Sequence, residues 1–187
     1  MNKWLCLTLL VPGTMFGQSG DCSRPFEAAL AAGQSLEMEL RSGEVRIEGT
    51  DRPVLRVTCE VRDQAKDVRI VLAGMKLRVE RGPSNNVHYR IEIPKQTNLT
   101  VRVTAGDVAI TGITGDKDIG LRAGTLMIEA GRPELYRRVH ASVTTGDLNA
   151  RAFGAQKGGL FRSFTKNDGP GKYDFRASVT AGELVIR

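Results

Sequence analysis

Several acidic residues directly follow a glycine, and a regular series of carboxylates is one way for a protein to bind a cation. The acids are Glu44, Asp107, Asp147 and Glu183, whereas Thr125 takes this place in a fifth copy of the pattern. Carboxylates on neighbouring strands would lie about 4.8 Å apart and could form a column. Calcium-binding repeats, however, use a tighter Gly-Gly-x-Gly-x-Asp pattern, which this sequence lacks.

Turn chemistry therefore explains the glycine–acid pairs better than metal binding. Glycine tolerates a positive φ, and an acid beside it can accept hydrogen bonds from nearby backbone amides. We expect the acid of each pair to hold the amides of its corner, and we predict no metal site and no cofactor. The predicted structural corners are Gly43, Gly106, Asp107, Gly124, Gly146, Asp147, Gly182 and Glu183.

Catalytic chemistry has little support in the residue pattern. Glycoside cleavage needs two carboxyl groups about 5–9.5 Å apart. Asp116 and Asp118 are close in sequence, but at this spacing in a strand-like segment both side chains point to solvent. His88 and His140 are far apart, and the chain has no serine nucleophile motif or phosphate-binding loop. We predict no catalytic residue, and a polysaccharide-active β-helix enzyme remains the alternative.

Residues 153–176 combine aromatic and cationic side chains and form the candidate interaction surface. Such a mixture can stack on sugars or bases while it holds an anionic polymer. The other interpretation, which we favour, is that the aromatic residues cap the open end of a stack of strands. The candidate residues are Phe161, Arg162, Phe164, Lys166, Lys172 and Tyr173.

The elements that must position these residues are strands. Apolar residues alternate with polar ones along most of the chain, as at Leu36, Met38 and Leu40, and this period of two predicts strands with one wet face. Residues 26–32 form the one short helix candidate. The predicted fold class is all-β.

The spacing of the glycines favours a stack of repeated turns. Glycines 106 and 124 are 18 residues apart, 124 and 146 are 22 apart, and 146 and 182 are 36 apart, which leaves room for a degenerate turn at 159–168. Repeats near this length predict stacked rungs, and a parallel coil should be right-handed. We predict a single-stranded right-handed β-solenoid or β-roll, in which residues 36–95 form a less regular antiparallel cap. An antiparallel meander fits the same side-chain pattern.

Three segments resemble the bacterial putative adhesin family, a β-strand-repeat domain of unknown function. They read "LRSGEVRIEGTDRPVLRV", "IEIPKQTNLTVRVTAGDVAITGITGD" and "GPGKYDFRASVTAGELVI", and the resemblance extends from about Leu36 to Arg187. The resemblance implies an exported β-solenoid or β-roll with an adhesin-like role. It brings no catalytic residues with it.

The N-terminus and the cysteines indicate export. Residues 1–18 combine Lys3, an apolar run and small residues, which predicts a secretory signal peptide ahead of one domain over residues 19–187. We expect no transmembrane segment after cleavage, and a periplasmic, outer-surface or secreted location. Cys22 and Cys59 can form a disulfide in such a compartment, although Cys59 also fits a buried strand position.

The leading functional hypothesis is an exported, non-enzymatic module for cell-surface or envelope interaction. The net charge of +6 is compatible with an anionic glycan as its ligand, or with a protein partner. A second alternative is a module that binds anionic polymer through residues 153–176. The C-terminal strand "ELVIR" is a candidate edge for self-association.

Overall fold

The computed structural model describes residues 17–61, 67–82 and 87–187. Residues 1–16 of the predicted signal peptide lie outside this part of the chain. The described strands are β1 (Gln18–Gly20), β2 (Phe26–Ala29), β3 (Ser35–Thr50), β4 (Val54–Val61), β5 (Arg69–Ala73), β6 (Lys76–Arg81), β7 (Val87–Pro94), β8 (Asn98–Thr111), β9 (Lys117–Ile128), β10 (Tyr136–Ala150), β11 (Ala155–Lys166) and β12 (Tyr173–Ile186).

Strands dominate the fold, and the two described helices are single 3₁₀ turns at Pro133–Leu135 and Arg151–Phe153. No helix in the described ranges has the length and apolar character needed to cross a bilayer. The all-β prediction is confirmed. The helix candidate at 26–32 is wrong, because Phe26 and Ala28 are buried while Glu27 and Ala29 are exposed, which is the alternation of a strand.

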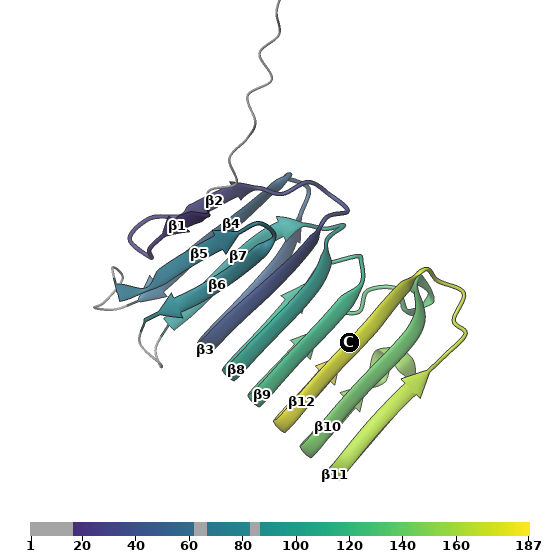
Figure 1. The fold of residues 1–187 in the computed structure, drawn as a ribbon. Helices are drawn as coiled ribbons and strands as arrows, with labels where there is room; N and C mark the ends of the chain where they lie inside the picture. Colours follow the sequence, from purple (N-terminus) through teal and green to yellow (C-terminus); the bar gives the residue numbers. More distant parts are fainter. Residues whose placement is uncertain (1–16, 62–66, 83–86) are drawn as a thin grey trace, which may run out of the picture.

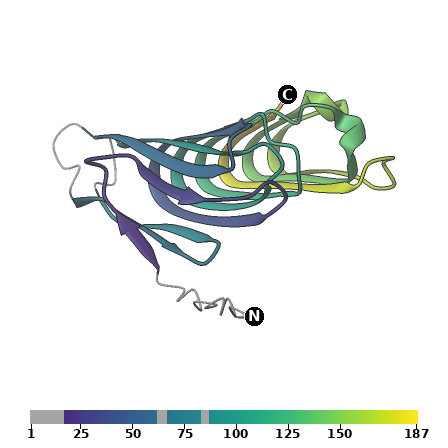
Figure 2. The same ribbon diagram turned by 90° about the horizontal axis from the view of Figure 1, so that it is seen from above.

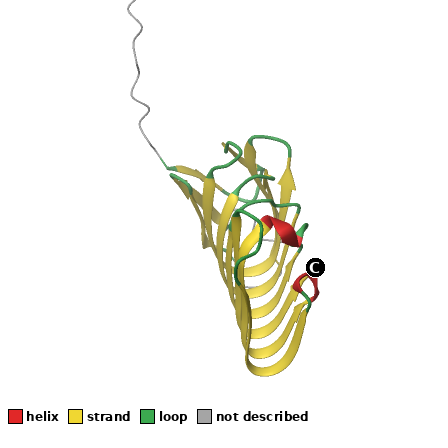
Figure 3. Cartoon of the chain, turned by 90° about the vertical axis from the view of Figure 1, so that its right-hand side faces the viewer, coloured by secondary structure: helices red, strands yellow, loops and turns green. Residues whose placement is uncertain are grey.

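Five long strands form the centre of the molecule. They lie in the order β3, β8, β9, β12 and β10, and every neighbouring pair is parallel. Each strand bends sharply near its middle, so that the five strands look like nested hairpins when seen along the stack (Figures 2 and 3). We call the part before the bend the first arm and the part after it the second arm.

The predicted corner glycines lie at these bends in one row. Gly43 is opposite Gly106, Gly106 is opposite Gly124, and Gly182 lies between Gly124 and Gly146. A β-carbon on Gly106 would lie 2.0 Å from the carbonyl oxygen of Gly43. The φ angle of Gly106 is 124°, in the region that L side chains rarely adopt. Both observations require glycine at the bend.

Apolar side chains fill the space between the two arms. One row runs along the first arms and contains Leu40, Val103, Leu121, Val179 and Val143. A facing row on the second arms contains Val45, Val108, Leu126, Leu184 and Leu148. All ten side chains are buried. Because each row continues across neighbouring strands, every strand buries its apolar face against the next one.

The strand order departs from chain order at the C-terminal end. Strand β12 lies between β9 and β10, and β11 is the outermost strand, antiparallel to β10 (Figure 1). The prediction that "ELVIR" forms an edge is therefore wrong, because β12 has a partner on both sides. Residues 159–168 do not form a further parallel turn, since Gly159–Lys166 belong to the antiparallel β11.

The physical reason for this strand order lies in the residues that continue the two apolar rows. Strand β12 supplies Val179 and Leu184 to them, whereas β11 places Arg162 and Lys157 at the corresponding positions. A strand with two cations on its inner face is stable at the end of the stack, where water reaches the charges, and is unfavourable inside it. The sheet is mixed and not closed.

The N-terminal strands extend the two arms separately. Strands β6, β5 and β1 continue the sheet from the first arm of β3, and β7, β4 and β2 continue it from the second arm. Antiparallel pairs predominate among the strands that follow β3, so an antiparallel N-terminal cap is confirmed only for that part of residues 36–95. The prediction is wrong for β3 (Ser35–Thr50), which belongs to the parallel stack because its apolar rows continue those of β8, and which also pairs in parallel with β6 and β7. A disulfide joins Cys22 to Cys59, so Cys59 is not a free buried cysteine.

Candidate binding face

The aromatic residues of the segment 153–176 pack at the end of the stack. Phe153 lies 5.7 Å from Phe175 and 6.3 Å from Phe164 between ring centroids. Tyr136 makes an edge contact with Phe175 at 5.3 Å. Phe175 is fully buried, and Phe153 and Phe164 pack against the core. These side chains close the apolar space between the arms, which is the capping role that the sequence favours.

The six candidate interaction residues do not share one face. Phe164 and Tyr173 are packed against the core. Phe161 is 80% exposed. Arg162 donates from Nε to the carbonyl oxygen of Gly158 at 2.6 Å, and Lys166 and Lys172 reach solvent. The ammonium group of Lys172 lies 4.8 Å from the centre of the Tyr173 ring.

The corner acids differ in what they contact. Asp107 accepts a hydrogen bond at 3.3 Å from the backbone amide of Thr125, so it holds the corner of the neighbouring strand and not its own. Glu44 contacts Nδ1 of His88 at 2.7 Å and Nε of Arg46 at 3.1 Å. These two contacts, with His88 first, lower the pKa of Glu44. No group of three potential metal ligands occurs among the described residues.

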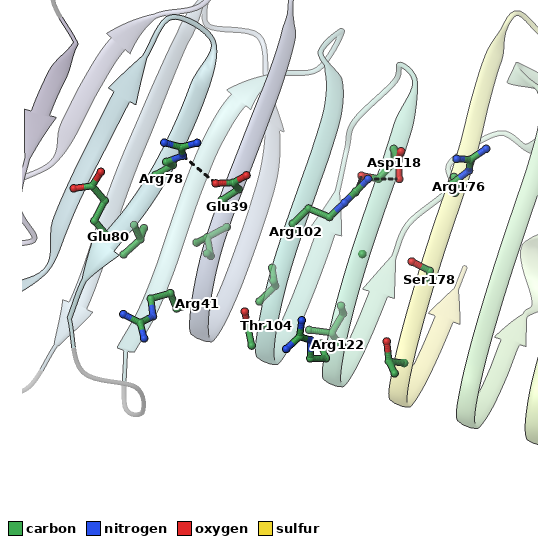
Figure 4. A pocket seen from close by; sticks show the side chains of 16 residues that line it. Glu39, Arg41, Arg78, Glu80, Arg102, Thr104, Asp118, Arg122, Arg176 and Ser178 are labelled. Carbon is green, nitrogen blue, oxygen red and sulfur yellow. Dashed lines mark hydrogen bonds and ion pairs between the residues drawn. The ribbon is translucent and has the colours of Figure 1, made fainter.

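An open hollow lies on the outer face of the first arms, and Arg176 is the one residue in its lining that belongs to the segment 153–176. It is an open groove of about 730 Å³ that crosses β6, β3, β8, β9 and β12 (Figure 4). Its floor consists of the polar positions that alternate with the apolar rows. These positions are Glu39, Arg41, Arg78, Glu80, Arg102, Thr104, Asp118, Gly120, Arg122, Arg176, Ser178 and Thr180.

Each carboxylate in this groove has a cationic partner. Glu39 accepts hydrogen bonds from Lys76 at 2.5 Å and Arg78 at 2.9 Å, and the bond from Lys76 is the main cause of its lowered pKa. Asp118 pairs with Arg102 at 3.0 Å. Glu80 lies 3.7 Å from Arg69. The charge of each groove carboxylate is therefore balanced by a neighbouring cation.

Three arginines of the groove remain without such partners. Arg41, Arg122 and Arg176 are exposed and make no ion pair or side-chain hydrogen bond with any described residue. Arg41 and Arg122 occupy the same place in their strands, two residues before the corner glycine, and Thr104 and Thr180 have that place on β8 and β12. Free guanidinium groups and hydroxyls thus alternate across neighbouring strands.

Gly120 gives the groove its depth at the centre. A β-carbon there would lie 3.2 Å from Cδ of Arg102 and 3.6 Å from Oγ of Ser178. Without a side chain at this position, Arg102 can lie across β9 and reach both the carbonyl oxygen of Asp118, at 2.7 Å, and its carboxylate. Arg102 therefore neutralises Asp118, and the free arginines face solvent across an otherwise neutral floor.

Sequence reasoning missed this groove because its residues come from strands that are distant along the chain. Only the register between the strands brings Arg41, Arg122 and Arg176 to one face. The signal that could have revealed part of it is the repeated "LRSG" and "LRAG", which places an arginine at the same polar position before two corners.

Comparison with known proteins identifies no family. No family model matches the sequence, and no curated protein matches it. A search of solved structures finds similarity to a "putative cell adhesion protein" from Clostridium sporogenes ATCC 15579, with 11% identity and a TM-score of 0.48. The match covers 87% of this chain and 98% of that chain. Membership of the adhesin family stays a prediction.

Proposed function

We propose that the protein is an exported, non-enzymatic binding module of the cell envelope or surface, built on a β-roll of bent strands. We further propose that it holds an acidic polysaccharide across the outer face of its first arms. The observation that carries this proposal is the presence of three unpaired arginines, Arg41, Arg122 and Arg176, in one groove. The role is adhesin-like in the sense that the stack presents a long, rigid polar face.

The chemistry of the groove fits carboxylate or sulfate groups. A guanidinium group binds a planar or tetrahedral oxyanion through two parallel N–H donors. Arg41 and Arg122 lie two strands apart, on β3 and β9, with Thr104 of β8 between them. Two strand spacings correspond to roughly 10 Å. A polymer that crosses the strands could place an anionic group at each arginine and sugar hydroxyls against the threonine between them.

The carboxyl groups with a shifted pKa do not fit the acid catalyst of glycoside cleavage. Glycoside cleavage needs a carboxylic acid that stays protonated near neutral pH, usually through a raised pKa. The shifted carboxyl groups among the described residues, Glu39, Glu44 and Asp174, all have a lowered pKa. Each is held as the anion by a hydrogen bond from a cationic or imidazole partner.

The test is retention on immobilised heparin and polygalacturonate as a function of salt. The groove variant carries Arg41→Ser, Arg122→Ser and Arg176→Ser. The control variant carries Arg162→Ser, Lys166→Ser and Lys172→Ser, which removes the same charge from the part of the segment 153–176 that lies outside the groove. We expect the groove variant to lose retention, with the slope of log K against log salt smaller by about two to three. The control should keep most of its binding.

Three results would overturn the proposal. Equal losses in both variants would mean that binding follows net charge only, and a loss confined to the control would move the ligand to Arg162, Lys166 and Lys172. New reducing ends in the incubated polygalacturonate would show catalysis. Export is tested separately by N-terminal sequencing after expression with residues 1–18 present. Uncleaved protein that stays in the cytoplasm would contradict that part.

A further inference from the structure

Strand β11 ends the sheet and leaves one backbone edge open. One side of this strand, Ala155–Lys166, pairs along its length with β10. No strand among the described residues pairs with its other side. An open edge of this length can accept an added strand from another chain, and proteins usually protect such edges by specific side chains. The side chains of β11 therefore indicate what the edge is for.

Two cations lie at inner positions of β11, the last strand of the stack. Lys157 lies opposite Leu148, and Arg162 lies opposite Val143, so both occupy inner positions that are aliphatic on the five preceding strands. Lys157 donates from Nζ to the carbonyl oxygen of Ser163 at 2.8 Å, and Arg162 donates to that of Gly158 at 2.6 Å. In the absence of an acid, each cation is bound to the backbone of its own strand.

The edge strand is purely cationic. It contains Lys157, Arg162 and Lys166 and has no aspartate or glutamate between Ala155 and Lys166. None of the three cations forms an ion pair with a described residue. A carboxylate that approached the inner positions of this strand would replace a neutral carbonyl contact by a charge-assisted one.

Phe161 and Leu160 are exposed beside these cations, at the bend of β11. Phe161 is 80% exposed and Leu160 is 60% exposed. Phe161 also has a φ of 51°, a conformation that is unfavourable for a residue with a side chain. The core does not use either side chain, because the cap is made by Phe153, Phe164 and Phe175. Exposure and strain at one aromatic residue are features of contact sites.

We propose that β11 is a docking edge for an extended acidic segment of another protein, which adds to the sheet as its next strand. Acidic side chains of this segment form ion pairs with Arg162 and Lys157, and these ion pairs replace the hydrogen bonds of the two cations to backbone carbonyl oxygens. Apolar residues of the segment cover Leu160 and Phe161. A second copy of this chain fits less well, because pairing two β11 edges would bring six cations and no acid together. The proposal does not depend on the polysaccharide groove, which lies on another face.

The probe can be designed from β10, the strand that β11 already pairs with. It is a fluorescent peptide with the sequence of residues 139–150 carrying Val143→Glu and Leu148→Glu, the two positions opposite Arg162 and Lys157. The matched control peptide carries lysine at both positions. Binding is measured by fluorescence polarisation with the full mature protein. We expect the acidic peptide to bind at least about tenfold more tightly than the basic one.

Two protein variants separate docking from a purely structural role. Phe161→Gly removes the exposed ring and the unfavourable φ, so the protein should become more heat-stable while peptide binding weakens about tenfold. Arg162→Glu should reverse the preference between the two peptides. Equal binding of both peptides, or unchanged binding by Phe161→Gly, would overturn the proposal. If the unmodified protein forms a dimer and Phe161→Gly abolishes that dimer, the edge is assigned instead to a second copy of this chain.

Discussion

Replacing Lys117 by methionine should make the protein more stable near neutral pH. Lys117 begins β9, where it lies between Leu99 and Phe175 of the neighbouring strands, and it is 2% exposed. Its ammonium group donates to the hydroxyl of Tyr136 at 2.5 Å and lies 3.5 Å from the carbonyl oxygen of Gly115. Burial lowers the pKa of Lys117 from 10.5 to about 8, against a small opposing effect of Asp116.

This lowered pKa sets the size and the sign of the effect. The fall in the pKa from 10.5 to about 8 corresponds to roughly 3 kcal/mol. The folded state is less stable by this free energy when the amine of Lys117 is protonated. The penalty is complete below about pH 8, where Lys117 is charged in both states. It is relieved as the pH rises from about 8 to 10.5, because only the unfolded chain still holds the proton.

Methionine has a similar length and no charge, so Lys117→Met removes the penalty and keeps the packing. Tyr136 keeps its hydrogen bond to the carbonyl oxygen of Ala130 at 3.0 Å. The loss of the Lys117–Tyr136 hydrogen bond offsets about 1 kcal/mol of this gain in stability. We therefore expect a net gain in the free energy of unfolding of about 2 kcal/mol at neutral pH.

The assay is urea unfolding of both proteins at about pH 7 and about pH 9.5, on either side of the pKa of about 8. The gain should be largest at the lower pH and should shrink at the higher one. Lys166→Met, at an exposed position, is the control and should change stability by less than about 0.5 kcal/mol. A variant that is less stable than the original, or a gain independent of pH, would refute the reasoning.

Three further variants test the disulfide and the bends. Cys22 and Cys59 are 37 residues apart, so replacing both by alanine should lower the free energy of unfolding by about 4 kcal/mol if loop entropy dominates, as measured by urea unfolding. Unchanged stability would contradict this. Gly124→Ala would put a β-carbon 2.0 Å from the carbonyl oxygen of Gly106 at a φ of 126°, and should cost more than about 2 kcal/mol in thermal unfolding. Gly131→Ala has a positive φ but nothing within 4 Å, so it should cost about 1 kcal/mol. Equal losses of stability in Gly124→Ala and Gly131→Ala would show that crowding at the bend is unimportant.

The sequence predicted the parts of the fold that depend on local periodicity. Alternation such as that of Leu36, Met38 and Leu40 reports which residues face inward, and these three are buried. The glycines mark the bends because backbone conformation and space both exclude a side chain there. Each of these properties is determined within one strand and its neighbours, so a repeated pattern is enough to reveal it.

Strand order was not predictable in the same way. The segments that lead into Gly182 and Gly146 carry equally good aliphatic residues, so spacing alone cannot tell which of them lies next to β9. The deciding residues are Lys157 and Arg162, which make β11 unsuitable for the interior of the stack. Polar residues at inner positions, and not the length of the repeat, would have indicated where the stack ends.

The position two residues before each corner glycine is where this fold can vary without cost to its core. The inward neighbours Leu40 and Leu121 are buried, while Arg41 and Arg122 beside them are exposed. Replacing an exposed arginine therefore changes the charge of the groove and leaves the apolar rows intact. Converting Thr180 to arginine would add a third guanidinium to this row, next to Arg122. If the groove binds an acidic polymer, Thr180→Arg should strengthen retention on polygalacturonate, and unchanged or weaker retention would show that this row does not contact the ligand.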